Sequence, residues 1–165
     1  MQKVLVIGCP GSGKSTFSRA LSQQTGLPLC HLDMLFWNPD KTTVSKDTFL
    51  SRLTDVLKGE QWIIDGNFSN TLPLRLEHCD TVFFLDYSTD LCLESVRARL
   101  GKPRADMPWI EEEEDAEFMK FISRFAVDRR PKILALLQQY PQKNIHVFQN
   151  RDQADAYLAA LMKQK

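Results

Sequence analysis

The stretch GCPGSGKS, residues 8–15, decides the fold of this chain. It follows the apolar run VLVI, residues 4–7, and precedes TFSRAL, residues 16–21. This order predicts a buried strand, a glycine-rich loop and an amphipathic helix. Gly11 and Gly13 allow the loop to curl so that successive backbone N–H groups point inward, and the following helix adds its positive dipole end. The stretch therefore predicts a site for phosphate groups.

The same stretch has the spacing of a P-loop, or Walker A motif, in which two further side chains have roles. Lys14 supplies a positive charge to the outer phosphates, and the Ser15 hydroxyl is placed to bind Mg²⁺. An ordinary glycine-rich turn is the alternative. A dinucleotide-binding fingerprint does not fit, because the glycines are spaced G-x-x-G-x-G rather than G-x-G-x-x-G. The predicted nucleotide-binding residues are Gly8, Cys9, Pro10, Gly11, Ser12, Gly13, Lys14, Ser15 and Thr16.

The composition is that of an ordinary globular protein. The chain has 165 residues, 43% hydrophobic and 25% charged, so we expect a single domain spanning residues 1–165. Lys plus Arg number 21 and Asp plus Glu number 21, which leaves no broad basic field and does not favour direct nucleic acid binding. We find no signal peptide, no apolar run of membrane-spanning length and no C-x-x-C pairing, so we expect a cytoplasmic protein with reduced thiols.

Apolar periodicity alternates between strand and helix along the chain, which implies a parallel α/β sheet covered by helices. Strands are predicted at residues 3–7, 29–31, 62–64, 81–85 and 144–148. Helices are predicted at residues 14–24, 45–58, 72–78, 88–100 and 153–163, with a long helix opening at 111–115 and ended or kinked at Pro131. Residues 101–109, GKPRADMPW, are rich in turn residues and predict an exposed loop.

Three carboxylates follow predicted strands, at the edge where ligands bind in open parallel sheets. Asp65 is the first choice for holding Mg²⁺, directly or through water. Asp33 suits the binding of a second substrate, and it is the candidate base if that substrate presents a hydroxyl. For Asp86, a helix-capping role is an equal alternative.

Arginines cluster after the fourth strand and suggest a phosphate clamp. Arg97, Arg104 and either Arg129 or Arg130 are candidates to converge on a transferring phosphate, since guanidinium offers bidentate donors and positive charge. A solvated helix face that pairs with the acidic run 111–114 is the alternative. Residues 31–37 with Gly66 and Asn67 predict an acceptor region, in which Trp37 lines the pocket or merely packs in the core.

The inner motifs resemble the DNA topology modulation protein family, which belongs to the adenylate-kinase-like P-loop proteins. The motifs that carry the resemblance are GCPGSGKS, HLDMLFW, WIIDGNF, TLPLRLEHCDTVFFLD, CLESVRARLGKPRADMP and ISRF…RRP. The resemblance implies a Mg-ATP-binding protein with three layers, a five-stranded parallel sheet in the order 2-3-1-4-5 and a lid over about residues 101–117. It also implies that Asp65 holds Mg²⁺ through water and that Arg97 and Arg104 are lid arginines.

The chain departs from adenylate kinases where those enzymes bind their acceptor. Asn67 and Phe68 follow Gly66, where adenylate kinases have Phe-Pro-Arg, and Arg75 is the nearest candidate for the missing arginine. Acceptance of AMP therefore does not follow from the resemblance.

Together these features predict an ATP-dependent phosphotransferase acting on a small acceptor of unknown identity. The predicted catalytic residues are Lys14, Asp33, Arg97, Arg104 and Arg130, and the predicted acceptor-binding residues are Asp33, Trp37, Asp65, Gly66, Asn67 and Arg75. A regulatory ATP-binding protein that affects DNA topology through partners and a plain NTPase are the alternatives, and the oligomeric state is open.

Overall fold

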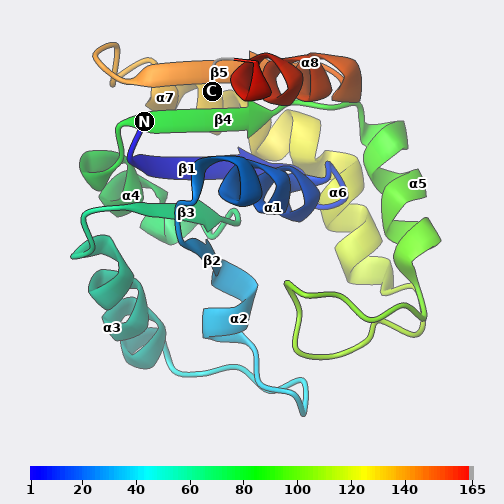
Figure 1. Ribbon diagram of the computed structural model, residues 1–165. Helices are drawn as coiled ribbons and strands as arrows, with labels where there is room; N and C mark the ends of the chain where they lie inside the picture. The colour runs from blue at the N-terminus through cyan, green and yellow to red at the C-terminus, as the bar shows by residue number, and fades with distance from the viewer. Residues whose placement is uncertain (164–165) are drawn as a thin grey trace.

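The computed structural model describes residues 1–163, which form one five-stranded parallel sheet with helices on both faces (Figure 1). The strands are β1 (Lys3–Gly8), β2 (Leu29–His31), β3 (Trp62–Asp65), β4 (Thr81–Leu85) and β5 (Asn144–Phe148). Their order is β2-β3-β1-β4-β5, so the predicted α/β fold and strand order are confirmed. β1 therefore lies in the centre of the sheet, and the glycine-rich loop leaves the sheet at its middle.

Register brings the predicted strand-end residues to one edge of the sheet. Val6 of β1 pairs with Asp65 of β3, and His31 of β2 pairs with the same residue from the other side. Gly8 pairs with Leu85 of β4. Because the strands are parallel, their carboxyl ends meet at this edge, which is where ligands bind in such sheets.

The helices cover the apolar sheet and frame that edge. In Figure 1, α1 lies on the near face over β1, and α4 lies on the far face. α1 packs against α8, and α5 packs against α6. The helices are α1 (Lys14–Thr25), α2 (Leu32–Phe36), α3 (Lys46–Leu57), the short 3₁₀ turn η1 (Ser69–Thr71), α4 (Leu72–His78), α5 (Thr89–Arg99), α6 (Ala116–Asp128), α7 (Arg130–Leu137) and α8 (Arg151–Met162).

One expectation about residues 101–115 is wrong, and another holds only in part. The acidic run 111–115 does not open a helix, because the Asp115 side chain caps α6 by accepting from the backbone N–H of Phe118 at 3.0 Å. The loop that was expected to be exposed is partly docked, since Asp106 is buried. Near Pro131 the predicted break is present, because α6 ends at Asp128 and α7 begins at Arg130. Within residues 1–163, no helix combines the length and apolarity needed to cross a membrane.

Candidate active site

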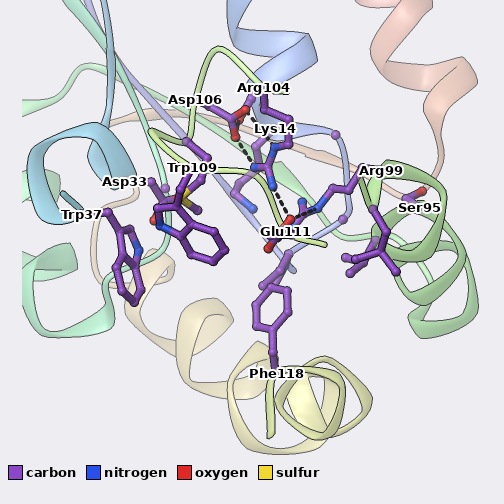
Figure 2. Close-up of a pocket in the computed structure, with 18 of the residues that line it drawn as sticks. Lys14, Asp33, Trp37, Ser95, Arg99, Arg104, Asp106, Trp109, Glu111 and Phe118 are labelled. Carbon is purple, nitrogen blue, oxygen red and sulfur yellow. Dashed lines mark hydrogen bonds and ion pairs between the residues drawn. The ribbon is translucent and has the colours of Figure 1, made fainter. Parts of the chain in front are cut away.

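One cavity of about 1570 Å³ opens at the carboxyl edge of the sheet. Its walls come from the glycine-rich loop, from α2 and the end of β3, from α5 and from the loop 101–115 (Figure 2). The volume exceeds the range of about 300–1,000 Å³ that single small ligands occupy. The cavity therefore has room for a nucleotide and a second molecule at once.

The glycine-rich loop fits against α5 with little tolerance. Gly11 has φ 85°, and a Cβ there would lie 2.2 Å from the carbonyl oxygen of Cys92. Gly13 has φ 88° and forms the N-cap of α1 without any side-chain hydrogen bond. No side chain therefore caps the N-terminus of α1, whose dipole is available to an anion in the cavity.

The Lys14 ammonium curls back over its own loop. Its Nζ donates to the carbonyl oxygens of Gly8 at 3.0 Å and Cys9 at 3.2 Å. Burial lowers the pKa of Lys14, and the nearby Asp65 carboxylate opposes that shift. The lysine thus sits beside the loop backbone with its charge inside the cavity.

The loop 101–115 is tied to the phosphate loop through Asp106. The Ser15 hydroxyl donates to Asp106 Oδ2 at 2.8 Å, and Arg104 pairs with the same carboxylate. Burial raises the pKa of Asp106, but the hydrogen bonds and charge of Arg104 outweigh burial and hold that pKa far below its usual range. Glu111 in turn binds Arg104 and Arg99, each at 2.8 Å. The sequence motif RADM contains Asp106, but sequence reasoning assigned it no role.

Asp65 lies at the end of β3 with one oxygen fixed and one free. His31 Nδ1 is 2.9 Å from Oδ1, whereas Oδ2 is buried and has no hydrogen-bond partner. Burial lowers the pKa of His31, but the bond to Asp65 and its charge raise that pKa overall. Sequence reasoning gave His31 no role, since its partner lies 34 residues away.

The residues present fit a Mg²⁺ ion bound together with phosphates. The Ser15 hydroxyl and the orphaned oxygen of Asp65 are hard oxygen donors, which Mg²⁺ prefers. Among residues 1–163, no group of three or more His, Cys, Asp or Glu side chains gathers as a metal cluster. Phosphate oxygens and water would therefore have to complete the ion's coordination, which is the usual arrangement for Mg²⁺ at nucleotides.

Asp33 projects from α2 into the same cavity as Lys14 (Figure 2). Burial raises the pKa of Asp33 to about 6 from an ordinary value of 3.8, against the opposing charge of Lys14. A carboxylate with such a pKa can accept a proton from a hydroxyl at neutral pH.

Aromatic rings line the wall next to Asp33. Trp37, at the end of α2, packs edge-to-face against Trp109 of the loop 101–115, with ring centroids 5.7 Å apart. The ring centroid of Phe36 lies 5.3 Å from that of Trp37 and 5.0 Å from that of Phe68. Trp37 lines the cavity and also packs against neighbouring rings, and its contact with an acceptor stays a prediction.

Three of the predicted arginines lie elsewhere. Arg75 is fully buried and donates to the carbonyl oxygens of Gly66, Asn67 and Phe68, so it holds the segment after β3 rather than an acceptor. Arg97 is half-exposed and pairs with Glu114 at 2.6 Å.

Arg130 pairs with Asp86 at 2.7 Å, away from the cavity wall. Asp86 does not cap α5, because Ser88 caps it by accepting from the Leu91 N–H.

The remaining predicted residues gather at the cavity. Gly8, Cys9 and Ser12 form the base of the phosphate loop, where the Gly8 N–H donates to Asn67 Oδ1 at 3.2 Å. Arg99, which the sequence analysis did not select, also lines the cavity. The predicted residues that line it are Pro10, Gly11, Gly13, Lys14, Ser15, Thr16, Asp33, Trp37, Asp65, Gly66, Asn67 and Arg104.

Comparison with known proteins identifies the fold. No protein-family model matches the sequence, and a comparison with curated proteins finds no match. Among solved structures, the chain is similar to shikimate kinase from Bacteroides thetaiotaomicron, with a TM-score of 0.64 and 20% identity over 98% of this chain and 96% of that chain. It is also similar to shikimate kinase from Acinetobacter baumannii in complex with shikimate, with a TM-score of 0.63 and 15% identity over 100% and 95%. The fold is thus the P-loop fold of the nucleoside monophosphate kinase type.

Proposed function

We propose that this chain is an ATP-dependent kinase that transfers the γ-phosphoryl group of ATP to a small acceptor. The observation that carries the proposal is that one cavity contains the phosphate loop with Lys14 and, across from it, the Asp33 carboxylate. A phosphate site alone indicates only nucleotide binding. A base beside a second, aromatic-lined compartment supports transfer to a bound molecule.

In the proposed complex, the triphosphate lies on the loop residues 8–16 and at the N-terminus of α1. Lys14 exchanges its loop carbonyl partners for the outer phosphate oxygens. Ser15 and Asp65 would hold Mg²⁺, which would supply positive charge to the phosphate oxygens when bound. Phosphoryl transfer depends mostly on positioning and charge neutralisation, so a rigid phosphate site supplies much of the catalysis.

The remaining positive charge comes from the end of α5 and from the loop 101–115, which is the part of the predicted lid that precedes α6. Arg99 at the end of α5 and Arg104 in the lid both line the cavity and share Glu111 as their partner. A γ-phosphate competes with Glu111 for these guanidinium groups. Closure of the lid over the acceptor keeps water from the transferring group, which favours transfer over hydrolysis.

The test is acceptor-dependent ADP release in the presence of Mg-ATP. The Lys14→Met protein should lose at least about 100-fold in kcat, because charge stabilisation at a transferring group is worth several kcal/mol. Lys58→Met is the matched control, since Lys58 is exposed at the end of α3 and pairs with Asp55. Full phosphotransfer by the Lys14→Met protein would refute the mechanism.

The narrower resemblance, to the DNA topology modulation family, remains a proposal. A regulatory role would give ATP binding without any acceptor response, together with salt-sensitive retention of DNA. A plain NTPase would release ADP at a rate that no acceptor changes. The same assay therefore separates the three functions.

A further inference from the structure

The part of the cavity beside Asp33, here called the acceptor compartment, has an acidic side chain and an aromatic wall formed by Trp37 and Trp109. We infer that the acceptor is an uncharged ring compound carrying a hydroxyl group, seated against the corner formed by Trp37 and Trp109; this inference rests on the kinase function proposed above. The ring is recognised by aromatic contact, and the hydroxyl is directed to Asp33. Phosphate monoesters and carboxylates are excluded by charge.

Most of the cavity's positive side chains come from α1, α5, α8 and the lid. Within the described residues, those that line it are Lys14, Arg19, Lys41, Arg99, Arg104 and Arg151. Arg19 donates to the Thr16 hydroxyl on α1, and Arg151 donates to Ser95 of α5. Arg104 and Arg99 are bound by lid carboxylates and face the phosphates. Only Lys41 comes from the segment between α2 and β3.

Neither Lys41 nor Arg75 supplies an anion site for the acceptor. Lys41 is exposed at the rim, with its Nζ 5.3 Å from the centroid of the Trp109 ring. Arg75 is committed to three backbone carbonyl oxygens, and no part of it lines the cavity. Lys14 and Arg104 act electrostatically on Asp33, but both contact the ATP phosphates in the proposed complex, and Asp65 would hold Mg²⁺ there. The charged group that remains for the acceptor is then the Asp33 carboxylate. An anionic acceptor would face like charge there without a compensating cation.

The cavity wall next to Asp33 is aromatic rather than polar. Trp37 and Trp109 meet at 77°, and Figure 2 shows both indoles beside Asp33 and away from Arg99. Such a corner presents ring faces and edges to a flat or cyclic ligand. The Trp109 Nε1 is buried without a hydrogen-bond partner, so a ligand oxygen that reached it would satisfy an unpaired donor. Trp109 belongs to the lid, so acceptor binding and lid closure share one contact.

The transfer step balances with Asp33 as the proton acceptor. The acceptor's hydroxyl oxygen forms a bond to the γ-phosphorus of ATP, and its proton passes to the Asp33 carboxylate. The bond between the γ-phosphorus and the bridging oxygen breaks, and its electron pair stays on the departing ADP. A phosphate acceptor would need no base, so the presence of Asp33 beside the wall agrees with a hydroxyl.

The experiment compares matched acceptors that differ in charge. The protein with Mg-ATP is given thymidine against thymidine 5′-monophosphate, adenosine against AMP, and the methyl ester of shikimate against shikimate, a carboxylate. Phosphorylated product is detected by mass spectrometry, and Mg-ATP binding is measured separately by calorimetry. We expect at least one uncharged compound to be phosphorylated with a kcat/KM roughly 100-fold or more above that of its anionic counterpart.

Variants at the aromatic corner test the wall itself. Trp37→Ala should raise the KM of the uncharged acceptor roughly 10-fold or more while the KM of ATP changes by less than about 2-fold. Trp37→Phe keeps an aromatic ring and should therefore recover most of the acceptor affinity that Trp37→Ala loses. A merely structural defect at this position would not predict that recovery. Trp37→Arg places a cation near Asp33 and should shift preference toward the anionic compounds. Leu50→Ala, at an exposed position on α3, is the control.

The outcomes separate this inference from the kinase function. Phosphorylation of the anionic compounds at equal or higher kcat/KM would overturn the uncharged acceptor and leave the kinase intact. Failure of every uncharged compound while an anionic one reacts would do the same. Loss of Mg-ATP binding, or no transfer to any compound, would contradict the kinase function itself, and the inference with it.

Discussion

Replacing Asp33 by Asn should make the protein more stable at neutral pH and abolish phosphoryl transfer. Burial raises the pKa of Asp33 to about 6, so the folded state binds this proton more tightly than the unfolded chain does. A group of this kind lowers stability as the pH rises from its unfolded to its folded pKa. The amide of the Asp33→Asn variant has no proton to lose, so its contribution stays constant.

The magnitude follows from the size of the shift. The pKa rises from 3.8 to about 6, and each unit corresponds to about 1.36 kcal/mol. The ionised carboxylate therefore costs about 3 kcal/mol of stability above pH 6, and nothing below the unfolded pKa. About 2 kcal/mol of this difference develops between about pH 4.5 and pH 8.

Urea unfolding of both proteins at several pH values measures the effect. The difference in unfolding free energy, variant minus wild type, should increase by about 2 kcal/mol from pH 4.5 to pH 8. Any constant effect of the amide cancels, because only the change with pH is compared. Asp40→Asn is the control with the opposite sign, since hydrogen bonds from the Thr42 hydroxyl and backbone N–H lower the pKa of this exposed carboxyl.

If the difference in unfolding free energy stays constant over this pH range, or decreases as the pH rises, then the ionised Asp33 carboxylate does not destabilise the fold and the reasoning is refuted. The Asp33→Asn variant should bind Mg-ATP normally and lose transfer to a hydroxyl acceptor. Wild-type kcat should rise with pH through about 6, because the base must be unprotonated.

Two further predictions concern residues that position the site. Asp106→Ala frees Ser15 and one side of Arg104, so it should destabilise the protein by about 1–3 kcal/mol at pH 7 and speed amide exchange in the lid. Because the Asp106 pKa is lowered in the fold, this loss should fade as the solution is acidified; an undiminished loss at low pH would contradict it. Arg75→Met should cost about 2–4 kcal/mol in urea unfolding, since buried carbonyls lose their donors, whereas the exposed Arg124→Met should cost little. Lost acceptor binding at unchanged stability would instead restore Arg75 as a phosphate ligand.

Much of the fold follows from local sequence. The run VLVI before GCPGSGKS, and TVFFL later, are almost wholly apolar, which is the pattern of buried central strands. Helix ends follow from Ser45 and Ser88, whose hydroxyls accept from backbone N–H groups three residues on. The acidic run 111–115 misled, because its charges suit a helix start but Glu111 is engaged by Arg99 and Arg104 instead.

The site was less predictable, because the role of each side chain depends on hydrogen bonds and ion pairs with residues far away in the sequence. Arg75, Arg97 and Arg130 have the chemistry of phosphate ligands, and nothing local distinguishes them from Arg104. Their roles depend on which carbonyl or carboxylate group binds each guanidinium in the fold. Arg130, for example, pairs with Asp86, which lies 44 residues away in the sequence. The bond between Ser15 and Asp106 spans 91 residues, so no window of sequence reveals it.

The two halves of the cavity differ in how their polar groups are partnered. On the nucleotide side every key group has an internal partner: loop carbonyls for Lys14, Asp106 for Ser15, and Glu111 with Asp106 for Arg104. Phosphates binding there exchange partners rather than create new charge pairs, so ATP affinity is the difference between two similar sets of contacts.

On the acceptor side, Asp33 forms no ion pair within the part of the chain that the structure describes, and the cations that act on it, Lys14 and Arg104, are those that contact the phosphates in the proposed complex. An anion entering there finds nothing to exchange with, whereas a neutral ring buries its surface against the indoles and offers Asp33 a hydroxyl. The selection between acceptors therefore comes from the missing cation as much as from the aromatic wall. Adding a cation at Trp37 is for this reason the most direct way to change which molecules are phosphorylated.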